Sequence, residues 1–304
     1  MGFFKKSRNR SYDLFSSYAC YVPDVVGVVC LLLMFLLGML LGSCAQLLLA
    51  FLTSTDIAMS YGMLISYPLM FIPPMLYASA KSRRNEGFDA GIAIDSAHWG
   101  RYNGWKMAFI VTALTLACSF MTDGINALMP PVSDKLKSVL EAVMNGPVWV
   151  SFISVAIFAP FFEEWLCRGM ILRGLLQKYS PATAICISAL IFALIHGNLW
   201  QGVAAFLLGC VFGYVYYRTG SLKLTMLMHC VNNTFALVLS NIPALKDFDT
   251  MFDAMHLWSY LLVMACAIVI AFFGIVALRS IPLAEGKRCN CDSVEPLNSE
   301  IINS

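Results

Sequence analysis

The stretch VWVSFISVAIFAPFFEEWLCR begins at Val148 as an apolar run and ends at Arg168 among charged side chains. The uncharged part, from Val148 to Phe162, is 15 residues long. A helix needs about 20 apolar residues to cross a bilayer core about 30 Å thick, so this part is too short to cross alone. The helix must therefore continue through Glu163, Glu164 and Arg168. Charges inside a membrane cost about 2.5 to 3.5 kcal/mol each on insertion scales, so these side chains need partners, an aqueous cavity or a position near the interface.

The whole chain has the composition of a membrane protein. Of its 304 residues, 59% are hydrophobic and 12% are charged, and the mean hydropathy is +0.74. Water-soluble domains average about 45 to 50% apolar and about 25% charged residues, so the composition excludes a water-soluble globular protein. The 20 Lys and Arg nearly balance the 18 Asp and Glu. This balance excludes the strongly basic surface that a nucleic-acid-binding protein needs.

Apolar stretches long enough to cross a bilayer recur along the chain. They predict an all-α fold, a polytopic membrane helical bundle of about eight transmembrane helices. The expected spans are residues 25–52, 61–80, 106–128, 148–176, 182–200, 203–217, 222–239 and 257–278.

Positive charge is divided unevenly between the two sides of this bundle. With eight spans, 17 of the 20 Lys and Arg lie on the side of the N-terminus, and only Lys135, Lys137 and Lys246 lie on the other. Cytoplasmic loops hold the excess of Lys and Arg, so both termini are expected in the cytoplasm. The basic start of the chain is also typical of a signal peptide, but the run 25–52 is too long for one and is expected to remain as the first span.

Two GxxxG patterns, at residues 38–42 and 209–213, allow helices to approach closely. A bundle of eight helices has many internal contacts, so the patterns favour packing within one chain over dimerisation. The oligomeric state stays open.

Eleven cysteines are present. Nine of them occur singly in or beside apolar runs and are interpreted as small core residues. Cys289 and Cys291 form a CxC pattern in the polar tail, with too few neighbouring ligands to predict a metal site there.

Two further predicted spans carry polar side chains at helical spacing. The fifth contains Phe192 and His196, and the seventh contains His229 and Asn233. Residues four apart share one face of a helix, so the members of each pair are expected to point the same way.

The charged residues of the fourth span are expected to lie on two different faces of its helix. Glu164 precedes Arg168 by four residues, which is the spacing of an intrahelical ion pair. Neighbouring Glu163 points about 100° away from Glu164 and is left for another role. One glutamate is therefore expected to be structural and the other chemical.

This set of side chains suits hydrolysis. A carboxylate assisted by a histidine can take a proton from water, and a second histidine with an amide N–H can donate hydrogen bonds to an oxyanion. The same residue types also hold membrane helices together through interhelical hydrogen bonds. From the residues alone, a non-catalytic membrane scaffold or transport accessory protein is an equal alternative.

The three motifs together match the pattern of a known family. EExxxR at 163–168, FxxxH at 192–196 and HxxxN at 229–233 resemble the signature of the CAAX-prenyl-protease and bacteriocin-processing family of intramembrane proteases, also called the abortive-infection family. The resemblance covers about residues 148–239. It implies a peptidase whose substrate is a peptide bond, beside a prenylated cysteine in eukaryotic members of the family.

The resemblance also implies a role for each motif residue. Glu163 corresponds to the catalytic glutamate that activates water together with His196, and His229 with Asn233 corresponds to the pair that stabilises the oxyanion. By the same resemblance, Glu164, Arg168 and Phe192 correspond to residues that support the site structurally.

The family mechanism implied here uses no cofactor. A zinc-dependent protease on the same residues is a further alternative, because Glu163, His196 and His229 match the ligand set of a catalytic zinc site. The zinc motif HExxH is absent from the chain.

Four segments follow from these expectations. Residues 1–24 form a cytoplasmic N-terminal segment, 25–147 the first spans with an outer interfacial helix at 133–144, 148–239 a catalytic transmembrane core, and 240–304 the last span with a cytoplasmic tail. The expected partners are the lipid bilayer and a peptide or lipidated peptide substrate. Short loops and the lack of a targeting signal favour the bacterial inner membrane.

Overall fold

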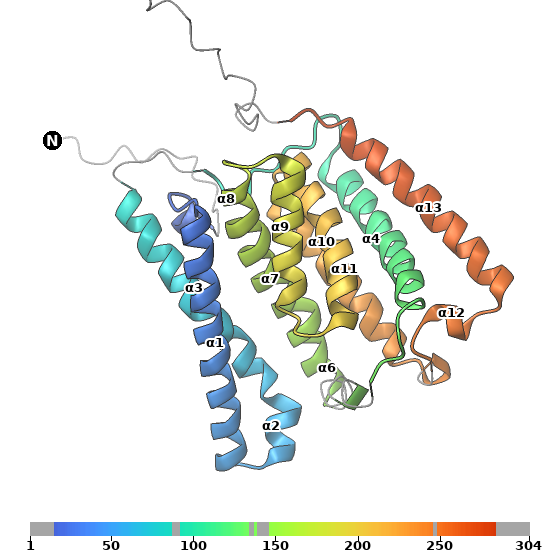
Figure 1. Ribbon diagram of the computed structural model, residues 1–304, viewed down its shortest axis with the longest axis horizontal. Coiled ribbons are helices and arrows are strands. Elements are labelled where there is room, and N and C mark those ends of the chain that lie inside the picture. Colours follow the sequence, from blue (N-terminus) through green and yellow to red (C-terminus); the bar gives the residue numbers. More distant parts are fainter. Residues whose placement is uncertain (1–14, 87–91, 134–136, 139–145, 246–247, 284–304) are drawn as a thin grey trace, which may run out of the picture.

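The computed structural model describes residues 15–86, 92–133, 137–138, 146–245 and 248–283. Within these ranges the regular structure is helical, as the sequence predicts (Figure 1). The elements are η1 (Ser16–Tyr18), α1 (Val25–Leu52), α2 (Thr55–Tyr61), α3 (Met63–Asn85), α4 (Gly104–Asn126), α6 (Val148–Ser151), η2 (Phe152–Phe158), α7 (Ala159–Glu164), η3 (Trp165–Leu172), α8 (Arg173–Leu175), α9 (Pro181–Leu194), α10 (Leu199–Thr219), α11 (Leu222–Ser240), η4 (Pro243–Leu245), α12 (Met251–Ala254) and α13 (Leu257–Arg279).

Seven helices in the described ranges are long and apolar enough to cross a membrane. The segment 148–175 is one of them, a continuous run in which α6, α7 and α8 alternate with the π-helical turns η2 and η3. Figure 1 shows it between α1 and α3 on one flank and α4 and α13 on the other, beside α9, α10 and α11. The expected polytopic helical bundle is confirmed, with seven such helices among the described residues in place of the expected eight, because Pro181–Leu194 is shorter.

The expected fifth and sixth spans, at 182–200 and 203–217, are wrong in their boundaries. The helix α9 ends at Leu194, and α10 already begins at Leu199. Gly197 has a φ of 68°, in the left-handed region that glycine tolerates best, and the Asn198 side chain accepts a hydrogen bond from the N–H of Gln201 at the start of α10. At 1.5 Å per residue, the 14 residues of α9 rise about 21 Å, less than a full bilayer core.

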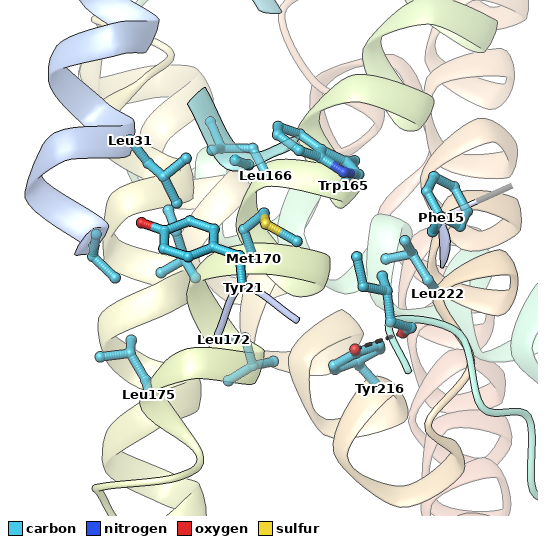
Figure 2. Packing of buried hydrophobic residues seen from close by; sticks show 14 of the residues in the cluster. Phe15, Tyr21, Leu31, Trp165, Leu166, Met170, Leu172, Leu175, Tyr216 and Leu222 are labelled. Atoms are coloured by element: carbon cyan, nitrogen blue, oxygen red, sulfur yellow. Dashed lines mark hydrogen bonds between the residues drawn. The ribbon is translucent and has the colours of Figure 1, made fainter. Parts of the chain in front are cut away.

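The segment 148–175 lies at the centre of the bundle. Of the apolar window within it, 61% is buried, against 17% for α13 at the edge. Figure 2 shows Trp165, Met170 and Leu172 packed among Leu31, Tyr216 and other core residues. A central helix of this kind can present side chains to several neighbours at once.

One buried cation ties the end of this segment to the chain ahead of α1. The Arg173 guanidinium is buried and donates to the backbone carbonyls of Tyr18, Tyr21 and Ile92. These carbonyls accept from the two terminal nitrogens of the guanidinium, which reduces the large desolvation cost of the buried cation.

The GxxxG patterns pack helices within the chain, as expected. A Cβ atom on Gly38 would lie 2.0 Å from the Met70 carbonyl oxygen, and one on Gly42 would lie 2.8 Å from that of Ser66, so α1 and α3 approach at backbone distance. A Cβ atom on Gly209 would similarly lie 3.1 Å from the side chain of Ala189 on α9.

The interpretation of the cysteines as core residues holds only in part. Cys167 is buried, but Cys44, Cys186 and Cys266 are exposed on the outer faces of helices, where a small apolar side chain can also meet lipid. Most of the expected interfacial helix at 133–144, the first 14 residues, and the CxC pattern of Cys289 and Cys291 lie outside the described residues.

Candidate active site

The two adjacent glutamates end the short helix α7, between the π-helical turns η2 and η3. Glu163 is 8% exposed and Glu164 is fully buried. π-helical turns are rare and often occur at functional sites. Both carboxylates thus lie inside the bundle, where each needs a partner.

Glu164 has that partner one helical turn away. Its Oε1 atom lies 2.7 Å from Nη1 of Arg168, and both side chains are fully buried. The second guanidinium nitrogen of Arg168 donates to the carbonyl of Gly209 at 3.0 Å, and the ring centroids of Phe192 and Phe212 lie 4.4 Å and 5.5 Å from the guanidinium. The ion pair expected from the spacing is therefore present, and it joins α7 to α9 and α10.

His229, on α11, contacts both glutamates through its two ring nitrogens. Its Nδ1 atom is 3.0 Å from Oε1 of Glu164, and its Nε2 atom is 3.9 Å from Oε2 of Glu163. A carboxylate can only accept, so we infer that Nδ1 carries a proton and donates it to Glu164. Nε2 then faces Glu163 at a distance too long for a direct hydrogen bond.

A tyrosine from a distant helix completes the surroundings of Glu163. The Tyr67 hydroxyl, on α3, donates a hydrogen bond to Oε1 of Glu163. The other oxygen, Oε2, is buried and has no hydrogen-bond partner among the described residues. The sequence analysis missed Tyr67, because nothing in the local pattern distinguishes it from the other 11 tyrosines of the chain.

His196 lies in the turn after α9. Its Nδ1 atom is 2.8 Å from the carbonyl oxygen of Phe192, and the edge of its ring meets the Phe192 ring at 5.1 Å between centroids. The Phe192 ring also meets His229, at 5.5 Å, and so contacts both histidines. In the described part of the chain, no hydrogen bond or ion pair joins His196 to Glu163, so the expected cooperation of these two residues stays a prediction.

Asn233 is held by a chain of hydrogen bonds. Its Nδ2 atom donates to the carbonyl of Val155 in η2 at 2.8 Å, and its Oδ1 atom accepts from Asn232 at 3.0 Å. Asn232 in turn accepts from the Ser119 hydroxyl on α4 at 2.7 Å. One N–H of the Asn233 amide is left for another acceptor. Ser119 and Asn232 were also missed by the sequence analysis, which had no information on how α4 packs against α11.

The candidate zinc ligands do not converge. No group of three or more His, Cys, Asp or Glu side chains among the described residues is arranged to hold a metal ion. Glu163 and His229 face each other, but Nδ1 of His196 is bonded to a backbone carbonyl. These residues do not fit a zinc centre with three protein ligands, and we route no step through a metal.

Comparisons with known proteins agree with the motifs. Residues 145–235 match the model of a family described as type II CAAX prenyl endopeptidase Rce1-like. A similar protein, "Putative membrane peptidase YdiL" of Bacillus subtilis (strain 168), is 25% identical over 125 residues, which are 41% of this chain and 50% of that protein. The match thus spans half the length of that relative. No solved structure matches the chain. Through residues 145–235, this chain is similar to the CAAX-protease family.

Proposed function

We propose that this protein is an intramembrane endopeptidase that hydrolyses a peptide bond with a water molecule activated at Glu163. The observation that carries the proposal is the pair of atoms Oε2 of Glu163 and Nε2 of His229, 3.9 Å apart in a buried site. Polar groups at this separation are commonly bridged by water. A carboxylate oxygen without a protein partner, beside a histidine and inside a membrane helix bundle, suits proton transfer from that water.

The reaction runs in two steps. Oε2 of Glu163 takes a proton from water, the water oxygen bonds to the carbonyl carbon, and the carbonyl electrons move to its oxygen. The oxyanion then re-forms the carbonyl, the C–N bond breaks, and the leaving amine takes the proton from Glu163. This order keeps one residue as base and then as acid.

Donors for the oxyanion come from α11. His229 donates through Nε2 when that nitrogen is protonated, and Asn233 donates through its second amide hydrogen. The hydrogen bonds of these residues to Glu164 and to the Val155 carbonyl support this role, because they hold the donors in place before substrate binds.

His196 is proposed to assist Glu163. Because the Phe192 carbonyl can only accept, Nδ1 of His196 donates to it, which leaves Nε2 as an acceptor in the neutral ring. An acceptor of this kind can orient the attacking water. No cofactor takes part in the proposed reaction.

The proposed substrate is a peptide or lipidated peptide that reaches the site from the bilayer, and the proposed location is the bacterial inner membrane. The seven apolar helices, the description of the matching family as prenyl endopeptidases and the bacterial relative support these proposals.

Glu163→Gln is the variant that tests the proposal. The amide keeps the shape of the side chain but cannot take the proton, so cleavage is expected to fall to background while the thermal unfolding midpoint stays near that of the wild type. The matched control is Glu86→Gln, which makes the same change at an exposed position. Detergent-purified proteins are incubated with a peptide pool that includes farnesylated C-terminal tetrapeptides, and products are identified by mass spectrometry.

The outcomes separate the peptidase from a scaffold. Cleavage by wild type and Glu86→Gln, but not by Glu163→Gln, supports the peptidase. Equal cleavage by all three proteins contradicts the role of Glu163. A scaffold predicts that folded wild type cleaves nothing and that Glu163→Gln changes only stability.

A further inference from the structure

We propose that Tyr67 is a positioning residue of the active site, which occupies Oε1 of Glu163 and leaves Oε2 as the oxygen that activates water. This inference rests on the proposed function. It also extends the site beyond the matched segment 145–235, because Tyr67 lies on α3, 96 residues before Glu163.

The hydrogen bond from Tyr67 gives the two carboxylate oxygens of Glu163 different surroundings. The Tyr67 hydroxyl donates to Oε1, whereas Oε2 has no partner among the described residues and faces Nε2 of His229. A carboxylate without this hydrogen bond could rotate and offer either oxygen. With the Tyr67 hydrogen bond in place, Oε2 is the oxygen of Glu163 that faces His229. The proposed base and the proposed oxyanion donor then lie on the same side of the carboxylate.

Tyr67 itself is held by a stack of aromatic rings. Its ring stacks on Phe71 at 5.8 Å between centroids, and Phe71 stacks on Phe162 at 5.1 Å with 15° between the ring planes. Phe71 is fully buried, and Phe162 directly precedes Glu163 in α7. The stack fixes the distance between α3 and α7 and thereby the place where the hydroxyl meets the carboxylate.

The sequence next to Tyr67 explains how α3 reaches the site. Pro68 follows it, and Pro73 and Pro74 lie in the same helix. Each proline lacks an N–H and therefore removes one helical hydrogen bond. The helix α3 contacts η2 and α7 as well as its neighbour α1, so the N-terminal spans are part of the catalytic unit.

Tyr67→Phe tests this inference, because it removes the hydroxyl and keeps the ring stack. Tyr67 touches Glu163 and not the substrate, so the variant is expected to lose about 10- to 100-fold in kcat with KM within about twofold of the wild type. The matched control is Tyr77→Phe, the same change on the same helix at a tyrosine that packs on Tyr21 instead. Its kcat is expected to equal that of the wild type.

A measurement independent of activity accompanies the kinetics. Thermal unfolding midpoints of Tyr67→Phe, Glu163→Ala and the double variant form a double-mutant cycle, with Ala in place of Gln because a Gln oxygen could still accept from Tyr67. The shifts are expected to be non-additive, because each single variant already removes the hydrogen bond between Tyr67 and Glu163.

Each outcome has a clear meaning. A selective loss of kcat in Tyr67→Phe supports the inference, whereas an unchanged kcat, or equal losses in Tyr67→Phe and Tyr77→Phe, overturns it. If the folded wild type cleaves no peptide, the proposed function fails on its own. In that case the thermal cycle still decides on the contact, and additive shifts overturn it.

Discussion

Glu163 and Glu164 are chemically identical neighbours with different surroundings. Glu164 is fully buried, and its Oε1 atom contacts the guanidinium of Arg168 and the imidazole of His229. The contact with Arg168 is a charge-assisted hydrogen bond. Glu163 accepts from the Tyr67 hydroxyl at Oε1, and its Oε2 faces Nε2 of His229. The Oε2 atoms of both glutamates are buried without a hydrogen-bond partner among the described residues, and the one that Nε2 of His229 approaches is that of Glu163. Glu164 therefore joins helices through its contacts, and Glu163 is the carboxylate proposed for proton transfer.

The Arg168 guanidinium is the counter-charge that permits Glu164 to be buried. Arg168→Met removes it and leaves an uncompensated carboxylate, so we expect a loss of about 3 to 5 kcal/mol in unfolding free energy. Thermal or denaturant unfolding in detergent measures this loss. Arg84→Met, the same change at the exposed end of α3, is the control and is expected to have little effect. Equal stability of the two variants would contradict the structural role of Arg168.

Ser119 acts on the site only through other side chains. Its hydroxyl bonds Asn232, which bonds Asn233. The single hydroxyl proton of Ser119 is also within reach of the Thr115 carbonyl, at 2.8 Å. Ser119→Ala removes the contact with Asn232, and a hydrogen bond is worth about 0.5 to 1.5 kcal/mol, so we expect a loss of at most about 10-fold in kcat. Steady-state kinetics measures this loss. The control is Ser240→Ala, because the Ser240 hydroxyl donates to the Leu237 carbonyl of its own helix. A rate equal to that of the control would show that the Asn233 amide is held without Ser119.

At the level of elements, the turn between α9 and α10 places His196. The turn exists because Gly197 adopts a positive φ and Asn198 caps the next helix. No atom lies within 4 Å of a Cβ placed on Gly197, so a side chain there is opposed by backbone conformation alone.

Gly197→Ala isolates that backbone effect. The left-handed conformation costs a residue with a Cβ about 1 to 2 kcal/mol, so we expect the turn to shift and kcat to fall, by up to about 10-fold. Gly202→Ala is the control, because Gly202 is helical and a Cβ there would make only an ordinary contact at 3.5 Å. Activity and unfolding of both variants are compared. Full activity of Gly197→Ala would show that His196 does not need this turn.

At the scale of the whole molecule, the helices alternate in direction, and α1 begins at the end of the bundle where α13 finishes (Figure 1). The connection after α8 carries Lys178 at this end, and the connection between α1 and α2 carries Thr53 at the other. Most Lys and Arg lie at the end of the bundle where α1 begins, so this end is expected in the cytoplasm.

Cysteine labelling in cells tests this orientation. Thr53→Cys is expected to react with a membrane-impermeant maleimide in intact cells, whereas Lys178→Cys is expected to react only after permeabilisation. Both positions are exposed. The wild-type protein supplies the background from its native cysteines. The reverse pattern would place the basic end outside.

The sequence by itself determined the features that depend on local spacing and composition. It was sufficient to predict the membrane environment and the ends of α1. It also predicted the Glu164–Arg168 ion pair, because residues four apart lie on the same face of any helix. The motifs at 163–168, 192–196 and 229–233 also carry the resemblance to the family, because each depends only on the spacing of residues along the chain. The break at Gly197 had a local signal too, but the long apolar runs on both sides of it concealed it.

Only the tertiary structure decided which distant side chains meet at the site. Tyr67, Ser119 and Asn232 reach it through the rotation and packing of α3, α4 and α11. In a membrane helix the faces toward lipid and toward protein are both apolar, so hydropathy does not reveal which face is buried. The contact of Tyr67 with Glu163 joins residues 96 positions apart, and it depends on how α3 packs against η2 and α7 of the central segment.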